Sequence, residues 1–259
     1  MSLVIGQVQG HTGVVTLDHA AKRNILSRDL IEELIGTLGE MKAASVRSVI
    51  LRAQPGATVW SAGHDVTELP VSGRDPLSYD DPLRRVVRAI EALPLPVIAM
   101  IEGSVWGGAC ELAMTCDLAV AAPEVTFAFT PTRIGVPYNT AGIVNMMKSI
   151  GMPLLKEMLF TARPIPAERA LRLGMINDVV PREDLERFTM QMADLIAETS
   201  PICVALMKEE LRILSKSLPM SAETFERLQG LRQKVYDSRD YREGIRSFLE
   251  KRRPEFKGE

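Results

Sequence analysis

Short apolar runs alternate with amphipathic stretches through the first half of this 259-residue chain. The run from Val97 to Ile101 is apolar at every position, which is typical of an interior strand of a parallel sheet. Between Leu30 and Met41 the apolar residues recur at helical spacing, behind a potential N-cap at Ser27. The pattern predicts strands at 3–9, 13–18, 46–53, 97–101 and 118–122, and helices at 30–41, 82–93 and 109–115.

From about residue 139 onward the pattern becomes mostly helical. The predicted helices lie at 141–150, 153–161, 167–173, 183–199, 202–214, 222–236 and 241–251. Strands that alternate with helices, followed by helices alone, indicate an α/β fold. We therefore expect an α/β core over residues 1–200 and a helical C-terminal region over residues 201–259.

Composition narrows the classes of function. Apolar residues make up 46% of the chain and charged residues 25%, as in ordinary globular proteins. A net charge of -2 provides no positive excess to hold a nucleic acid or an anionic membrane. No run approaches the roughly 20 apolar residues that span a bilayer, and the N-terminus lacks a secretory pattern. We expect a cytoplasmic protein with neither nucleic acid nor membrane as its partner.

The cysteines and histidines argue against a metal site. The three cysteines, Cys110, Cys116 and Cys203, show no CxxC spacing, which disfavours a zinc cluster or a disulfide framework. Three histidines are too few and too scattered for a multi-histidine metal site. The sequence therefore predicts reduced thiols and no bound metal.

Two glycine-containing segments carry the candidate chemistry: Ser61 to Asp65, and Glu102 to Glu111 with Gly107-Gly108 in its middle. Glycines where a strand meets a helix let a ligand approach the backbone and leave the first helical amides unpaired. The helix dipole adds partial positive charge there, which suits a phosphate or a developing oxyanion. No complete phosphate-binding motif is present, and both segments are also compatible with ordinary turns.

Segments spread over nearly the whole chain resemble the crotonase superfamily, the enoyl-CoA hydratase/isomerase group. They are residues 61–65, 102–112, 116–122, 159–165, 170–177 and 243–252. The resemblance implies a crotonase-type spiral of ββα units with a helical C-terminal trimerisation region. It also implies an acyl-CoA substrate and assembly as a homotrimer or a dimer of trimers.

The same resemblance assigns expected roles to individual residues. The backbone amides of His64 and Gly108 would form an oxyanion hole for the thioester carbonyl. The coenzyme A part would be bound by Lys22, Arg23, Ile25, Ala62, Gly63, Asp65, Val66 and Lys251, with the Ala62 carbonyl on the adenine and Lys251 on the phosphates. For Lys251 the residue pattern alone favours an ordinary solvated helix end.

The expected reaction depends on two acidic positions. Hydration of an enoyl thioester needs an acid and a base, and one glutamate of the hydratases matches Glu111. The other position is occupied by Pro131, so paired-glutamate hydration is disfavoured. Glu111 could act as an acid or base, or it could be a half-buried glutamate bonded to backbone. The uncharged Thr130 and Tyr138 suit an anionic acyl group instead.

A narrower resemblance points to one reaction of the superfamily. Residues 60–65, 73–83, 103–108, 135–139 and 235–238 resemble the members that decarboxylate methylmalonyl-CoA. This implies formation of propionyl-CoA and CO2 through a thioester enolate, with no metal or organic cofactor. Tyr138 would then lie by the substrate carboxylate, and Thr130 would line the same pocket. Another crotonase reaction, or acyl-CoA binding without catalysis, remains the alternative.

Overall fold

Six strands form the larger sheet of the computed structural model, which describes residues 2–70, 74–215 and 221–258. Their order across the sheet is β1-β2-β3-β5-β7-β10; β1 and β2 are antiparallel, and all later neighbours are parallel. The bounds are β1 Val4–Gln9, β2 Thr12–Leu17, β3 Ser48–Ala53, β5 Val97–Ile101, β7 Leu118–Ala121 and β10 Asp178–Val179. Every residue of β3 and β5 is buried, as expected of interior parallel strands.

A smaller sheet lies beside the first and was not predicted. Its order is β4-β6-β8-β9, with β9 antiparallel to β8. The bounds are β4 Val59–Ser61, β6 Ser104–Trp106, β8 Thr126–Ala128 and β9 Ile165–Pro166. Within the glycine-containing segment Glu102 to Glu111, the strand β6 lies between the predicted strand 97–101 and the helix that begins at Gly108. Strands of two or three residues are too short to show a period-2 pattern.

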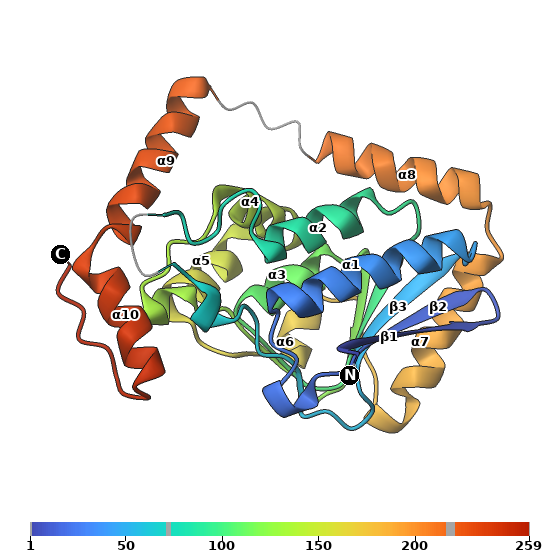
Figure 1. The fold of residues 1–259 in the computed structure, drawn as a ribbon. Coiled ribbons are helices and arrows are strands. Elements are labelled where there is room, and N and C mark those ends of the chain that lie inside the picture. Colours follow the sequence, from blue (N-terminus) through green and yellow to red (C-terminus); the bar gives the residue numbers. More distant parts are fainter. Residues whose placement is uncertain (1, 71–73, 216–220, 259) are drawn as a thin grey trace.

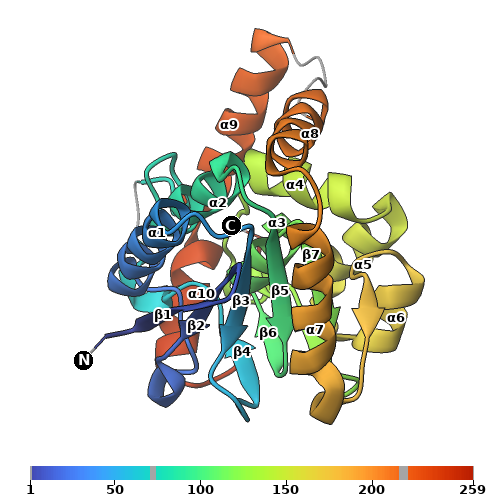
Figure 2. The ribbon, with the colours of Figure 1, turned by 90° about the vertical axis from the view of Figure 1, so that its right-hand side faces the viewer.

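Helices cover both faces of the larger sheet. The α-helices are α1 Arg28–Ala43, α2 Pro82–Ala92, α3 Gly108–Thr115, α4 Thr140–Ser149, α5 Met152–Thr161, α6 Ala167–Arg172, α7 Arg182–Ala197, α8 Pro201–Leu214, α9 Ala222–Tyr236 and α10 Arg239–Leu249. The chain also forms three 3-10 turns after β2, β4 and β8: η1 Ala20–Lys22, η2 Val66–Glu68 and η3 Pro131–Ile134. Neighbouring contacts link α1 to α2, α2 to α3 and α3 to α4, whereas α7 packs on β2, β3 and β5 (Figures 1 and 2).

The chain repeats a strand-strand-helix unit as it moves across the molecule. In turn, β3 and β4 are followed by α2, β5 and β6 by α3, and β7 and β8 by α4. In each unit the first strand joins the larger sheet and the second joins the smaller one. The predicted α/β organisation is therefore confirmed, and each unit delivers a short strand and a helix N-terminus to the same end of the molecule.

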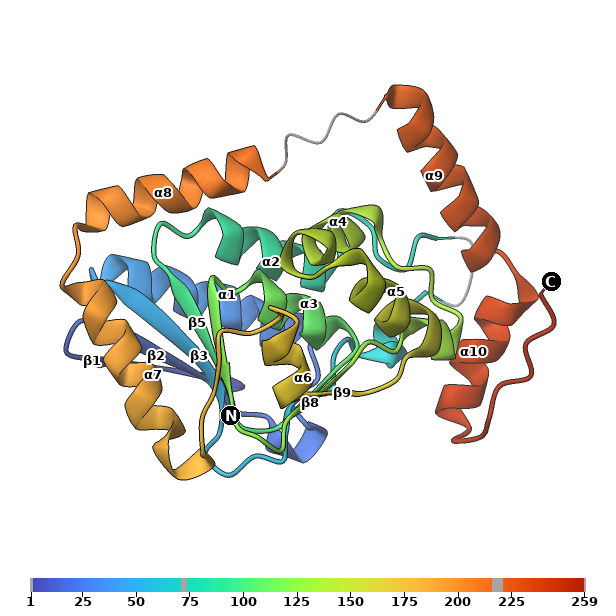
Figure 3. The same cartoon turned by 180° about the vertical axis from the view of Figure 1, so that it is seen from behind.

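The helices α8 and α9 extend beyond the body formed by the sheets (Figure 3). Both expose large apolar side chains: Ile202, Leu206, Met207, Leu211 and Leu214 on α8, and Phe225, Leu231 and Val235 on α9. Such an extent of exposed apolar surface marks an interaction site. Within the described residues, no helix combines the length and apolar character needed to cross a membrane.

Candidate active site

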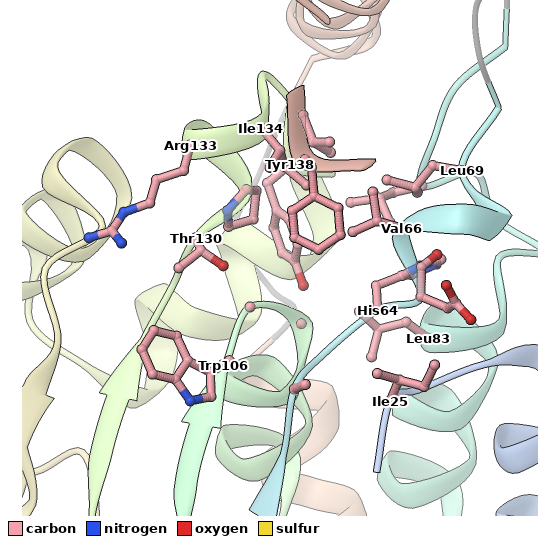
Figure 4. A pocket seen from close by; sticks show the side chains of 18 of the residues that line it. Ile25, His64, Val66, Leu69, Leu83, Trp106, Thr130, Arg133, Ile134 and Tyr138 are labelled. Atoms are coloured by element: carbon pink, nitrogen blue, oxygen red, sulfur yellow. The ribbon is translucent and has the colours of Figure 1, made fainter. Parts of the chain in front are cut away.

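A cavity of ≈ 590 Å³ opens where the smaller sheet meets the N-terminus of α3, in the range of small-molecule sites (Figure 4). Most of the residues predicted to bind substrate line it: Arg23, Ile25, Ala62, His64, Asp65, Val66, Gly108, Thr130 and Tyr138. Segments far apart in the sequence thus converge here. Its remaining apolar wall includes Leu69, Leu77, Leu83, Trp106, Ile134, Val136 and Phe248, none of which the sequence reasoning assigned.

Four predicted residues lie outside the cavity lining. Gly63 lies between two lining residues, and Lys22 is exposed at the end of η1, next to the lining residue Arg23. Lys251 is exposed just after α10, three positions beyond the lining residue Phe248. The fourth, Glu111, is completely buried behind Tyr138.

The loop after β4 is held by hydrogen bonds to the segment at Asn24. The amide of Ala62 donates to the Arg23 carbonyl at 2.9 Å, and the Ser61 hydroxyl donates to the Asn24 carbonyl at 2.6 Å. One residue further on, the Leu26 amide donates to the Gly63 carbonyl at 2.8 Å. The Gly63 carbonyl and the His64 N–H belong to one trans peptide bond, in which the two groups point in opposite directions. The His64 N–H therefore points away from Leu26.

The amide of Gly108 is the first of helix α3. The Gly107 carbonyl accepts a hydrogen bond from the Cys110 amide at 3.0 Å, within the helix. By the same peptide geometry, the Gly108 N–H points out beyond the helix N-terminus. The helix dipole places partial positive charge at this position. Gly108 N is therefore available to a ligand in the cavity that Gly108 lines.

The two loops approach each other as closely as backbones can. A Cβ built on Gly63 would lie 2.4 Å from the Trp106 carbonyl oxygen and 3.0 Å from Gly108 N. A Cβ on Gly108 would lie 3.7 Å from His64 N. Gly63 has φ +83°, which favours glycine on its own. The close approach brings the amides of His64 and Gly108 to neighbouring positions in the cavity wall.

Glu111 belongs to a buried cluster with Arg84 and Tyr138. Arg84 Nη1 lies 2.5 Å from Glu111 Oε1, and the Tyr138 hydroxyl donates to Glu111 Oε2. Arg84 is 7% exposed and Glu111 is 0% exposed, so the ion pair is shielded from water. Both carboxylate oxygens are thus engaged, which favours a positioning role for Glu111 over exchange of protons with a substrate.

Burial and charge shift the pKa values of this cluster in defined directions. Burial raises the pKa of the Glu111 carboxyl, while the Arg84 charge and the hydrogen bonds from Tyr138 and Asn145 counteract part of that rise. Burial and the neighbouring Glu111 raise the pKa of the Tyr138 phenol well above its ordinary value. Tyr138 therefore keeps its proton, and its ring packs edge-on against Phe129 with centroids 4.6 Å apart.

The position of the second hydratase glutamate carries no acid. Pro131 begins η3 and lines the cavity beside Thr130. Among the described residues that line the cavity, Asp65 has the only carboxylate, and its Oδ1 accepts hydrogen bonds from the amide and hydroxyl of Thr67. Paired carboxylates facing one reaction centre are thus missing from this part of the structure.

Sequence reasoning missed Asp81 and Arg84, which contact His64 and Glu111. Arg84 lies on the apolar face of α2 together with Val87 and Leu83, all three buried. A charged residue on an apolar helical face requires a buried partner, and this signal was present in the sequence. Within the described residues, no cluster of three or more metal-ligating side chains occurs.

A family model and similar proteins of known sequence all indicate one family for this chain. The model of the enoyl-CoA hydratase/isomerase family matches residues 7–259. Methylmalonyl-CoA decarboxylase of Escherichia coli (strain K12) is 51% identical over 245 residues, covering 95% of this chain and 94% of the relative. Short-chain-enoyl-CoA hydratase of Clostridium acetobutylicum is 28% identical, covering 97% of this chain and 96% of that protein.

Solved structures agree with the sequence relatives. Methylmalonyl-CoA decarboxylase in complex with 2-nitronate-propionyl-CoA superimposes with a TM-score of 0.98 at 49% identity, covering 99% of each chain. This likeness confirms the expected crotonase-type fold. On the match of the family model and of these relatives, the chain belongs to the enoyl-CoA hydratase/isomerase family.

Proposed function

We propose that this chain decarboxylates methylmalonyl-CoA to propionyl-CoA and CO2. The observation that carries the proposal is the pair of neighbouring backbone amides, His64 N–H and Gly108 N–H, in the wall of a cavity whose described lining residues include no paired acids. The 51% identity to a methylmalonyl-CoA decarboxylase over most of both chains supports the same reaction. Donors fixed in place before reaction are effective at stabilising a developing oxyanion.

The reaction breaks the bond between Cα and the carboxylate carbon. Its electron pair moves into the thioester to form an enolate, and CO2 departs. The enolate oxygen accepts hydrogen bonds from the amides of His64 and Gly108, which stabilise its charge. Addition of one proton to Cα then gives propionyl-CoA, so each turnover consumes one proton. Both electrons of the broken bond stay on the substrate. The proposed step therefore needs no metal or organic cofactor.

The carboxylate must leave perpendicular to the thioester plane for the electron pair to enter the carbonyl system. Tyr138 and Thr130 supply hydroxyl groups in the wall of the cavity that Gly108 also lines. In our proposal the Thr130 hydroxyl donates to the substrate carboxylate, and Tyr138 turns its single O–H from Glu111 to that carboxylate when substrate binds. Leu83 and Trp106 surround the carboxylate with apolar surface. Before substrate binds, Glu111 accepts the hydrogen bond of the Tyr138 hydroxyl and so holds it at the cavity wall.

The coenzyme A portion would extend from the cavity toward the exposed basic residues. Arg23 and Ile25 line the cavity, and Lys22 adjoins them at the surface. The segment Ala62 to Val66, including Gly63 and Asp65, would lie along the thioester arm. Lys251 would reach the phosphates of the same ligand or of one bound to a neighbouring subunit.

We further propose that residues 201–259 form the assembly region of a homotrimer or a dimer of trimers. The exposed apolar side chains of α8 and α9 support this, because contact with other subunits would cover them. A cytoplasmic location stays a prediction.

The test is a turnover assay with two substrates. Methylmalonyl-CoA should yield propionyl-CoA and CO2, whereas crotonyl-CoA should not be hydrated, because the second acid is missing. Separation of the acyl-CoA products by chromatography measures both reactions. Hydration of crotonyl-CoA without decarboxylation would overturn the proposal in favour of a hydratase. Tight binding of both compounds without turnover would favour a non-catalytic acyl-CoA-binding protein.

A further inference from the structure

Both ring nitrogens of His64 face oxygen atoms. Nε2 lies 2.8 Å from Asp81 Oδ2, and Nδ1 lies 3.0 Å from the backbone carbonyl oxygen of Asp65. The His64 side chain is only 11% exposed, so water has little access to either contact. These contacts have no part in the oxyanion hole described above, which uses only the backbone amide of His64.

The identity of the two partners fixes where the ring protons must be. A carbonyl oxygen can only accept, so Nδ1 must carry hydrogen to bond the Asp65 carbonyl. Asp81 Oδ1 accepts a hydrogen bond from the Leu83 amide at 3.0 Å, as the N-cap of α2. An ionised Asp81 likewise accepts from Nε2. Two N–H donors on one imidazole define the positively charged form.

We propose that His64 is an imidazolium in the active enzyme and that its charge stabilises the enolate held by its own backbone amide. The inference rests on the proposed function, since it names a further group acting on the same intermediate. The ring and the amide share one Cα, so the positive charge is fixed next to the oxyanion position. Electrostatic attraction is strong in such a site because water is largely excluded.

The charge of Asp81 does not cancel this effect completely. Its carboxylate lies at the N-terminus of α2, where the helix dipole offsets part of the negative charge. The imidazolium, in contrast, belongs to a residue that lines the cavity. The arrangement therefore presents the positive end of an ion pair to the substrate.

Other charged groups around His64 are engaged with their own partners. The Asp65 carboxylate accepts hydrogen bonds from Thr67, and the Glu68 carboxylate accepts from the Arg28 amide. On α2 and α3, Arg84 is paired with Glu111. Arg23, which also lines the cavity, is exposed. Asp81 is thus the ionised side chain in direct contact with the ring.

These surroundings define the expected pH dependence. Burial alone would lower the pKa of the His64 imidazole, but the hydrogen bond and charge of Asp81, with the Asp65 carbonyl and Glu68, raise it above its ordinary value. A raised pKa means that the ion pair is fully formed below the ordinary histidine pKa. It is lost as the pH rises through the raised value. Turnover should fall over the same alkaline range.

The protonation state can be measured without reference to activity. The chain has only three histidines, so selective 15N and 13C labelling of histidine gives three sets of ring signals. The His64→Asn variant identifies the His64 set by its disappearance. We expect 15N shifts of a doubly protonated ring at pH 7. Shifts of a neutral ring with one bare nitrogen at that pH would overturn the inference.

The kinetic test uses Asp81→Asn, because asparagine remains a good N-cap for α2 but removes the negative charge. We expect the alkaline limb of kcat to move to lower pH. Turnover should recover only at pH values well below the ordinary histidine pKa of about 6.5, because burial lowers the pKa of the ring once Asp81 no longer offsets it. An equal loss of kcat at every pH would contradict the inference, as would a wild-type profile.

Side-chain removal gives the size of the effect. His64→Asn keeps the backbone amide, so kcat should fall by about 10-fold, less than the loss of a whole oxyanion donor, and its alkaline limb should vanish. His11→Gln, at an exposed turn, is the matched control and should behave as wild type. If the wild type is active and His64→Asn has the same turnover, the proposed role of the His64 imidazolium is refuted, but the proposed decarboxylation is not. An inactive wild type would instead refute the proposed decarboxylation.

Discussion

At the scale of single residues, Tyr138 connects the cavity to a buried pair of charges. Its hydroxyl donates to Glu111, and Glu111 is in turn paired with Arg84. A tyrosine on an unsupported loop would rotate, whereas this one is fixed at its oxygen and along its ring by Phe129. The cluster thus orients a cavity-lining hydroxyl without placing a charge in the cavity.

Replacing Tyr138 by Phe removes that hydroxyl and retains the ring. We expect kcat for methylmalonyl-CoA to fall by about 10- to 100-fold, the kinetic equivalent of one lost charge-assisted hydrogen bond. KM should change little, because coenzyme A binding lies elsewhere. Steady-state kinetics measure both values. Wild-type kcat in this variant would remove Tyr138 from the mechanism.

Arg84 has a larger predicted effect on stability. Arg84→Met leaves the Glu111 carboxylate buried without its cation, which should cost about 3 kcal/mol of unfolding free energy. The double variant Arg84→Met with Glu111→Gln has no unpaired buried charge, so it should recover part of this loss. Denaturant unfolding gives the comparison. If the double variant is less stable than Arg84→Met alone, Arg84 does not act through Glu111.

At the scale of elements, the site depends on the contact between the loop after β4 and the start of α3. Gly63 is the point of closest approach, with no room for a side chain between the two backbones. Its positive φ of +83° adds a second reason for glycine. Packing and backbone conformation therefore place the two amides as one unit.

Gly63→Ala should separate the loop from α3 and disrupt the oxyanion hole. We expect kcat/KM to fall by at least about 100-fold, as when an oxyanion-hole donor is removed. Gly36→Ala is the matched control: Gly36 is exposed on α1 with open space around it, and the change should stabilise by about 0.5–1 kcal/mol. Full activity of Gly63→Ala would show that the close approach is not needed.

Elements differed in how well the sequence revealed them. Long periodic segments such as α1 and α7 were predicted, and so were the buried runs β3 and β5. The three-residue strands β4, β6 and β8 were missed, because their pairing comes from distant segments of the chain and not from local pattern. Those same strands carry the loops that form the cavity.

At the scale of the whole molecule, most of the predicted site residues reach one cavity, and they come from four regions of the chain. The glycine segments could be identified locally, but their approach is a long-range contact that no local pattern encodes. Family resemblance supplied the pairing of His64 with Gly108. The ion pairs of Asp81 and Arg84 were missed because their partners are known only from the folded chain.

The apolar faces of α8 and α9 predict an assembly that can be broken at one position. Leu211 is 69% exposed, so Leu211→Glu should have little effect on the fold of one subunit. A buried carboxylate between subunits is costly, and we expect monomers in size-exclusion chromatography with light scattering. Leu211→Met, the apolar control, should keep the wild-type mass. An unchanged mass in Leu211→Glu would exclude this face from the interface.

The central claim is that the amides of His64 and Gly108 bind the enolate oxygen. A crystal structure of this chain with 2-nitronate-propionyl-CoA, an acyl-CoA that carries a nitronate anion and cannot lose CO2, tests it most directly. We expect a thioester oxygen about 3 Å from both amide nitrogens and the nitronate beside Tyr138. A thioester oxygen turned away from these amides, with the ligand otherwise in the cavity, would contradict it.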